Sequence, residues 1–253
     1  MPRPLTRTEM VYDRLREDIV IGQLAPGSRL RFSDLAKRYG ASMGVTREAL
    51  SRLAEQGFVT SEPQLGFRVV TLSATDLLDL TETRCHVEVQ ALALAIEFGS
   101  IEWEANLLAA HHALSRTPST DLEHSRLTPQ WTHAHERFHG ALINGCPNTR
   151  LTTLSSSLRA NAEIYRSWST TYGTDRQTAA EHQDICTAAL DRDLDAAAGL
   201  LVAHLVETAA LLLRAAPDAT ENSLTRLAYI STDRSRSAQL FVERTQSGDR
   251  SGR

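Results

Sequence analysis

The feature that most constrains the fold of this chain is a change of sequence pattern near Thr75. Before it, short helical periods are broken by glycine and proline and are followed by two strand-like runs. After it, long alanine- and leucine-rich helical periods take over. A chain of 253 residues, 42% of them hydrophobic, is long enough for two domains with their own cores. We therefore expect a mostly α protein, in which a small N-terminal domain precedes an all-α antiparallel helical bundle.

The first 72 residues predict three helices and a small β-hairpin, the pattern of a winged helix-turn-helix. Ser33 is the candidate N-cap of the second helix, and Gly57 ends the third. Strand-like runs over 58–62 and 67–70 are joined by a short turn. The alternative is a generic small helical subdomain, because short helix pairs are common.

Helical periods in the rest of the chain predict a bundle, because the breaks between them are short. The predicted helices run over 75–98, 101–115, 122–144, 148–171, 175–190 and 193–215. The chain then becomes polar, and we expect a weak helix near 219–230 and a frayed tail. The predicted domains are 1–72, 73–217 and a partly disordered extension over 218–253.

The net charge of −4 argues against a protein that coats nucleic acid or an anionic membrane over its whole surface. The charge is uneven, however: residues 1–75 hold 11 Lys and Arg against 8 Asp and Glu, and the rest hold 16 against 23. The start, MPRPLTRTEM, lacks a secretory signal, and no window approaches eighteen uninterrupted apolar residues. The three cysteines form no CxxC pair, so they are interpreted as structural thiols. We expect a soluble, cytoplasmic protein with a basic N-terminal domain.

The start of the third predicted helix is the candidate DNA-reading element, because in helix-turn-helix proteins these positions meet base edges and phosphates. Arg47 can donate two hydrogen bonds to guanine or to phosphate. The alternative is an ion pair of Arg47 with Glu48 or Glu55 on a solvated face. In the hairpin, Gly66 either lets the backbone approach a minor groove or is a plain turn residue. The predicted DNA contacts are Ser42, Met43, Thr46, Arg47, Arg52, Gly66 and Arg68.

Four histidines lie within apolar helical stripes of the second domain. His135 and His139 leave the same side of one helix, whereas His182 and His204 belong to two later helices. Burying several unpaired imidazoles is costly, and neutral imidazole is a good ligand for Zn, Ni, Cu or Fe. The four residues are therefore candidate ligands of a divalent transition metal, with hydrogen-bonded core histidines as the alternative. The other five histidines are interpreted as structural or exposed.

Two further polar residues lie on helical stripes of this domain. Arg84 is in the first bundle helix, where it either meets a ligand carboxylate beside the metal or pairs with Glu88 one turn on. Asn161 follows a leucine stripe in the fourth bundle helix. We expect Arg84 and Asn161 to contact a small carboxylate effector.

The segments VYDRLREDIVIGQLAPGSRL, DLAKRYGAS, VTREALSRLAEQGFV and GFRVV resemble the DNA-binding domain of GntR-type bacterial transcription regulators. The segments TRCHVEVQALALA, ERFHGAL, EHQDI and AHL resemble the effector-binding domain of the FadR-type branch, the FCD domain. Together the two resemblances cover about residues 8–216. They imply a homodimer that binds a roughly palindromic operator.

The FCD resemblance also implies a metal site, which that family usually builds from an aspartate and three histidines. The family's last three ligands fall on His139, His182 and His204, and His135 occupies the position of the aspartate. An all-imidazole set is less anionic and favours later transition metals, with zinc or nickel ahead of copper or iron. In the reading helix, Met43 stands where the family commonly has an arginine, which implies a different operator or weaker binding. The C-terminal extension has no counterpart in the resemblance.

The leading hypothesis is a ligand-responsive transcription regulator, more often a repressor in such resemblances, and not an enzyme. Its effector would change operator affinity through its different affinity for two arrangements of the dimer. The first alternative, a metal-dependent enzyme, lacks a base, because Glu136 and Glu181 neighbour ligand histidines and should point away from the ligand face. The second is a DNA-binding protein without an effector, in which the histidines are core residues.

Overall fold

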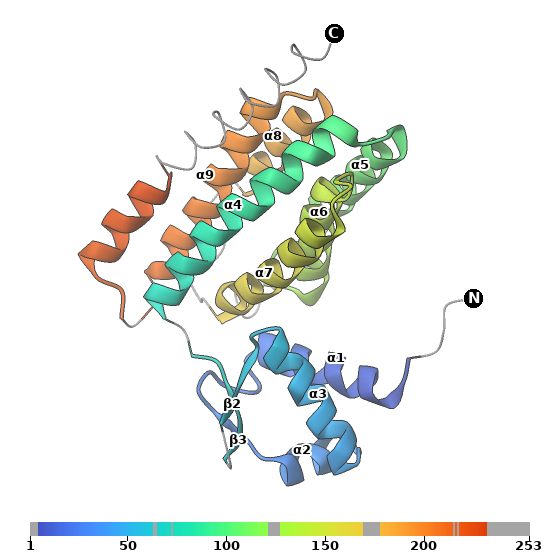
Figure 1. Ribbon diagram of the computed structural model, residues 1–253, viewed down its shortest axis with the longest axis vertical. Helices are drawn as coiled ribbons and strands as arrows, with labels where there is room; N and C mark the ends of the chain where they lie inside the picture. The colour runs from blue at the N-terminus through green and yellow to red at the C-terminus, as the bar shows by residue number, and fades with distance from the viewer. Residues whose placement is uncertain are drawn as a thin grey trace. The chain divides into compact units, whose positions relative to one another are not determined.

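The computed structural model describes residues 5–62, 65–71, 73–120, 127–168, 178–214, 216 and 218–231. Over these residues the chain is mostly helical, with one small antiparallel sheet (Figure 1). It divides into two compact units, Met1–Leu72 with Ala160–Trp168, and Ser73–Arg159 with Ser169–Arg253. The fold class is therefore the expected one, an N-terminal winged helix-turn-helix followed by a helical domain.

The described residues of 1–72 form three helices and a three-stranded sheet. The strand order is β1-β3-β2, and both pairings are antiparallel. Arg68 in the central strand pairs with Arg29 on one side and with Thr60 on the other. The elements are α1 Arg7–Val20, β1 Arg29–Leu30, α2 Phe32–Tyr39, α3 Met43–Glu55, β2 Val59–Glu62 and β3 Gly66–Val69. The short strand β1 was not predicted, since two residues show no alternation.

Capping residues fix where these helices begin and end. Thr6 and Glu9 form a capping box at the start of α1. The prediction of Ser33 as the N-cap of α2 was wrong, because the helix begins two residues earlier, at Phe32, after Arg31, which makes no side-chain cap. Gly40 ends α2 in the left-handed conformation, with φ of 59°.

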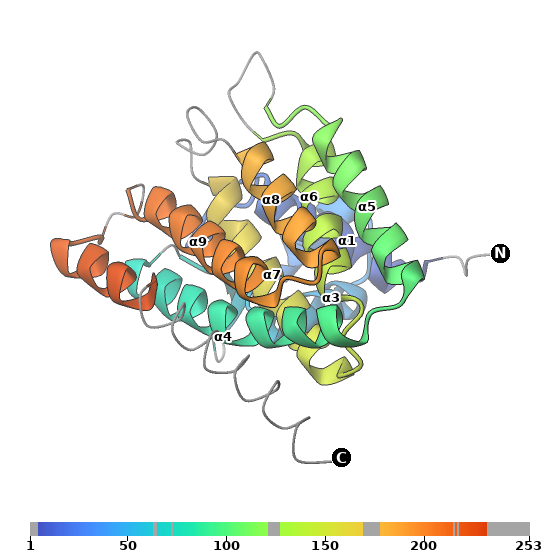
Figure 2. The ribbon, with the colours of Figure 1, turned by 90° about the horizontal axis from the view of Figure 1, so that it is seen from above.

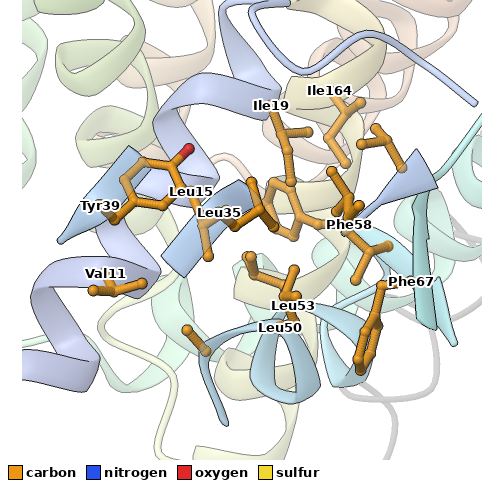
Figure 3. Close-up of a cluster of buried hydrophobic side chains, with 14 residues drawn as sticks. Val11, Leu15, Ile19, Leu35, Tyr39, Leu50, Leu53, Phe58, Phe67 and Ile164 are labelled. Atoms are coloured by element: carbon orange, nitrogen blue, oxygen red, sulfur yellow. The ribbon is translucent and has the colours of Figure 1, made fainter. Parts of the chain in front are cut away.

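One apolar cluster forms the core of the N-terminal unit (Figure 3). Leu15 of α1, Leu53 of α3 and Phe58 ahead of β2 are fully buried in it. Burial of a side chain of this size contributes about 1.5–3 kcal/mol. Ile164 belongs to the same cluster, which explains why the last turns of its helix group with this unit.

The second unit is built from helices. Helix α4 packs along α9, α8 packs against α9, and α5 packs against α6 (Figures 1 and 2). The elements are α4 Ala74–Phe98, α5 Ile101–Ser115, α6 Pro129–Ile143, α7 Thr149–Trp168, α8 Thr178–Leu190 and α9 Leu194–Leu213, and a further helix covers 221–231. All three cysteines are buried and free, and burial raises the pKa of the Cys186 thiol to about 11.

Most predicted helices differ from the observed ones only near their ends. Helix α5 has the predicted bounds, whereas α6, predicted from residue 122, begins at Pro129. Thr128 caps α6 with its hydroxyl, and proline suits the first helical position, where no amide hydrogen is needed. Parts of three predicted helices and the predicted frayed tail fall on 121–126, 169–177 and 232–253, outside the described residues.

Helix α9 is long and apolar enough to cross a membrane by length and composition alone. However, 56% of its most apolar 18-residue window is buried inside the protein. Leu201 and Leu205 lie in the core, and the helix packs against both α4 and α8. We therefore interpret α9 as the central core helix of the second unit.

Candidate nucleic-acid interface and metal centre

The start of α3 presents an exposed polar surface. Ser42 caps the helix, and its Oγ accepts a hydrogen bond from the Val45 amide at 3.3 Å. Met43 is 50% exposed, and Gly44 and Arg47 are exposed beside it. The partial positive charge of a helix N-terminus favours a phosphate at such a position. The predicted positions Ser42, Met43 and Arg47 thus lie together at the surface.

Thr46 does not belong to this surface. It is completely buried, and its hydroxyl donates a hydrogen bond to the Ser42 carbonyl at 3.0 Å. The prediction of Thr46 as a DNA contact was therefore wrong. The physical reason is the helical period, which turns Thr46 to the same inner face as Ala49, Leu50 and Leu53.

Two arginines of α3 are held by aromatic rings. The Arg47 guanidinium lies 5.0 Å from the centre of the Phe32 ring, and that of Arg52 lies 4.9 Å from the centre of the Tyr12 ring. Across the described part of the chain, Arg47 forms no salt bridge, so the alternative pairs with Glu48 and Glu55 are not observed. Stacking orders the guanidinium plane and leaves its N–H edges available to an acceptor.

Arg68 is engaged within the wing. Its Nε donates to Glu62 at 2.6 Å, and its Nη1 donates to the Gly27 carbonyl at 2.7 Å. The hydrogen bond from Arg68 lowers the pKa of the Glu62 carboxyl below its usual value. Arg68 therefore links the hairpin to the turn after α1, and because its side chain is still 39% exposed, its contact with DNA stays a prediction. Gly66 begins β3 with φ of 98°, a conformation that favours glycine.

The four predicted metal ligands converge in the second unit. His135 and His139 come from α6, His182 from α8 and His204 from α9, and each is only 2–3% exposed. One nitrogen atom from each ring lies within 4.8 Å of the others, and the Nε2 atoms of His135 and His139 are 3.2 Å apart. The Trp131 ring stacks on His135 with ring centres 4.6 Å apart. The four predicted residues thus form one buried cluster of imidazoles.

A carboxylate stands behind one of these rings. Glu181 Oε2 lies 2.8 Å from Nδ1 of His204. The expectation that Glu181 points away from the histidines was therefore wrong: it leaves α8 toward α9 and reaches a histidine on a different helix. A carboxylate on one ring nitrogen fixes the tautomer and directs the other nitrogen to a metal. The described residues thus have the donor set of a transition-metal site.

The two predicted effector contacts lie in different surroundings. Arg84 is buried on α4, and its Nε donates to Glu88 at 2.7 Å, which is the ion pair considered as its alternative. Asn161 belongs to the N-terminal unit. A methyl group built on Gly57 would lie 3.1 Å from its Oδ1, so the Asn161 amide packs against the turn after α3.

Residues 7–69 match the bacterial regulatory proteins of the gntR family, and residues 79–207 match the FCD domain. The FCD match alone covers more than half of the chain. The chain belongs to the GntR family and carries an FCD domain. It is a DNA-binding transcription regulator, as the resemblance implied.

Relatives and solved structures agree with this assignment. The HTH-type transcriptional regulator BphR of Paraburkholderia xenovorans is 37% identical over 199 residues, 78% of this chain and 81% of BphR. The transcriptional repressor GlaR of Escherichia coli is 35% identical over 202 residues, 77% of this chain and 90% of GlaR. The structure of E. coli McbR/YncC matches with a TM-score of 0.69 at 21% identity, over 84% of this chain and 99% of McbR, which shows the fold alone. These proteins are transcription regulators and not enzymes.

One buried arginine of this GntR-family chain was missed by the sequence analysis. The leucine stripe on α7 suggested Asn161, but Leu154 in that stripe is 45% exposed. The buried face of α7 instead carries Ser155 and Arg159, which are 0% and 8% exposed. Polar residues at four-residue spacing were the signal that could have identified this face.

Proposed function

We propose that this regulator is a cytoplasmic homodimeric repressor whose operator affinity changes when its FCD domain binds a divalent metal and a small carboxylate. The convergence of four buried imidazoles within 4.8 Å carries this proposal. GlaR, which is a repressor, is 35% identical to the chain over 202 residues, and this supports repression. The division of labour assigns DNA binding to 1–72, and metal, effector and dimerisation to 73–217, with 218–253 as an extension.

Operator binding is proposed to use the exposed start of α3. In a dimer, two such helices would enter successive major grooves about 34–36 Å apart, which requires a roughly palindromic operator. Arg47 is the proposed base or phosphate contact, and Arg52 would add a phosphate contact further along the helix. Met43 would present an apolar surface instead of a cation, so we expect an operator contact of different chemistry there. The proposed DNA contacts are Ser42, Met43, Arg47, Arg52, Gly66 and Arg68.

The histidine cluster fits a metal by its donor chemistry. His135, His139, His182 and His204 would hold the ion, and Glu181 would orient His204 through its Nδ1. Imidazole nitrogens suit zinc or nickel, and also copper or iron. The bound ion would supply a positive centre for a carboxylate oxygen. Because all four ligands are neutral, they would leave that charge uncompensated, which favours an anionic effector.

Regulation would follow from linkage between the two domains. A carboxylate that binds one arrangement of the dimer more tightly than another shifts the population toward that arrangement. Operator affinity then changes by the ratio of those two affinities, and DNA changes the affinity for the carboxylate by the same factor.

The test separates the two domains by mutation. Duplex DNA selected from a random library by the wild-type protein serves as the operator probe, and metal content is measured on the same samples. Arg47→Ala is expected to weaken operator binding by about 10- to 100-fold, because a bidentate contact is worth about 1–3 kcal/mol, and to leave metal content unchanged.

Arg150→Ala is the matched control, since this arginine is exposed on α7 and should change neither property. Loss of both operator binding and metal in Arg47→Ala would contradict the division of labour. Failure of the wild-type protein to select any sequence would contradict operator binding itself.

A further inference from the structure

A buried arginine that the predicted site does not contain lies against α6, the helix that carries His135 and His139. Arg159 on α7 is 8% exposed. A methyl group built on Gly140 of α6 would lie 4.0 Å from its Nη2. Gly140 directly follows His139, so the Arg159 guanidinium reaches the turn of α6 that carries two candidate metal ligands.

Charged groups surround Arg159 without satisfying it. On α4, Arg84 and Glu88 already form a buried pair at 2.7 Å. Glu88 and, more weakly, Glu136 of α6 attract Arg159, whereas Arg84 repels it. Nε and Nη1 of Arg159 form no hydrogen bond with the residues that the structure describes. Burial lowers the pKa of the Arg159 guanidinium from its usual value.

Arg159 is thus a buried cation whose Nε and Nη1 have no hydrogen-bonded partner among the described residues. Its guanidinium stays charged in proteins, and burial of a charge without a hydrogen-bonded partner is costly. The planar fork of N–H donors matches a carboxylate, which accepts two parallel hydrogen bonds from one guanidinium. Arg84 lacks this freedom at Nε, because Glu88 occupies that position.

We propose that Arg159 binds the carboxylate of the effector and that Arg84 and Glu88 are the charged residues next to Arg159. The inference rests on the proposed function, because it names the residue through which the FCD domain selects anionic ligands. Arg159 is thus a specificity-determining residue: neutral ligands of the same shape would leave its donors unsatisfied.

A purely structural role for Arg159 predicts the opposite effect on stability. If Arg159 held α7 to Glu88 or Glu136, its replacement would leave a buried carboxylate without a partner and would lower the melting temperature. If Arg159 instead binds an anionic ligand, the ligand-free protein holds an uncompensated buried charge. Replacement of Arg159 by an apolar side chain of similar length then removes this charge and raises the melting temperature.

The experiment compares full-length, metal-loaded protein with three variants by thermal unfolding. The probes are sodium acetate, sodium succinate and inorganic phosphate, with sodium chloride at equal ionic strength as the blank and acetamide as the neutral analogue. Arg159→Met removes the charge, and Arg159→Lys keeps it without the planar fork. Arg150→Gln is the matched control, an exposed arginine on the same helix.

Carboxylates are expected to raise the melting temperature of wild-type protein and of Arg150→Gln, and acetamide is expected to have no effect. Arg159→Met should melt about 2–4 °C higher than wild type in the blank. Its affinity for the carboxylate should fall by about 10- to 100-fold, the equivalent of a charged hydrogen-bond pair. Arg159→Lys should recover part of that affinity.

Three results would overturn the proposal. The first is a lower melting temperature of Arg159→Met with an unchanged response to carboxylate, which would make Arg159 a structural partner. The second is a wild-type response to phosphate but to neither carboxylate. The third is a wild-type protein that responds to no anion. Metal content read on the same samples reports the histidine cluster separately, so failure of the metal site and failure of Arg159 give different results.

Discussion

The winged helix-turn-helix and the FCD domain use their interiors in opposite ways. Among the described residues of 1–72, Thr46 is the one buried polar side chain, and the rest of that core is apolar. The FCD domain instead buries four histidines, the Arg84–Glu88 pair and Arg159. An apolar core offers no polar partner to a ligand, whereas buried polar side chains can bind one. This difference is why we place DNA binding on the outside of one region and propose ligand binding inside the other.

The largest expected effect comes from the apolar core of the N-terminal unit. Phe58 is completely buried, so Phe58→Ala should destabilise this unit by about 3–5 kcal/mol through lost burial and a new cavity. Chemical denaturation followed by operator binding measures the loss, and metal content should stay unchanged. Leu65→Ala, at a residue that is 52% exposed, is the control. Loss of metal from the Phe58→Ala variant would show that the core of the N-terminal unit also supports the histidine cluster, which contradicts the separation of the two cores.

The next effect concerns the carboxylate behind the histidine cluster. Removal of a hydrogen-bond partner of a metal ligand costs about 10- to 100-fold in metal affinity, so Glu181→Ala should bind zinc more weakly by this factor. Competition with a chelator of known affinity measures the change. Glu207→Ala, an exposed glutamate on α9, should bind zinc as the wild type does. Equal affinities of the two variants would show that Glu181 does not orient His204.

A smaller effect separates core from surface within α3. Thr46→Val replaces the buried hydroxyl that donates to Ser42, and we expect a loss of about 1 kcal/mol in unfolding free energy. Operator affinity of the folded protein should remain within a factor of two of wild type, because Thr46 does not reach the surface. A loss of operator affinity as large as that of Arg47→Ala would show that Thr46 belongs to the DNA interface.

The smallest effect tests the helix over 221–231, which lies beyond the FCD match. Arg226 pairs with Asp79 at 2.6 Å and with Glu82 at 3.1 Å, both on α4. Because this network is exposed and screened by salt, Arg226→Ala should cost less than about 1 kcal/mol. Thermal unfolding at low and high ionic strength measures it, and the difference from wild type should shrink as salt rises. A salt-independent loss would mean that packing of the arginine stem dominates.

Sequence patterns predicted the fold where apolar periods and helix-ending residues coincide. Helix α5 has a serine cap before it and a regular period, and its bounds were correct. Helix α6 was predicted too long, because it starts at Pro129 after the Thr128 cap, a start signal that the predicted bounds did not include. Strand β1 escaped detection because it exists only through its pairing with β3.

The site was predictable where residue type and spacing act within one element. The four histidines were identified because each lies on the inner face of α6, α8 or α9. Glu181 and Arg159 were not, because what they contact depends on how separate helices pack. Glu181 reaches across to α9, and Arg159 reaches α6 beside Gly140. The apolar period along a single helix does not predict either of these contacts between helices.

The most direct test of the account is elemental analysis of the purified, full-length protein, paired with its melting temperature before and after chelation. We expect about one transition metal per chain and a melting temperature that falls when the metal is removed, because an ion that binds only the folded state stabilises it. Protein without metal, with a melting temperature that chelator leaves unchanged, would contradict the account. The four histidines would then be core residues of a regulator that binds DNA without a metal.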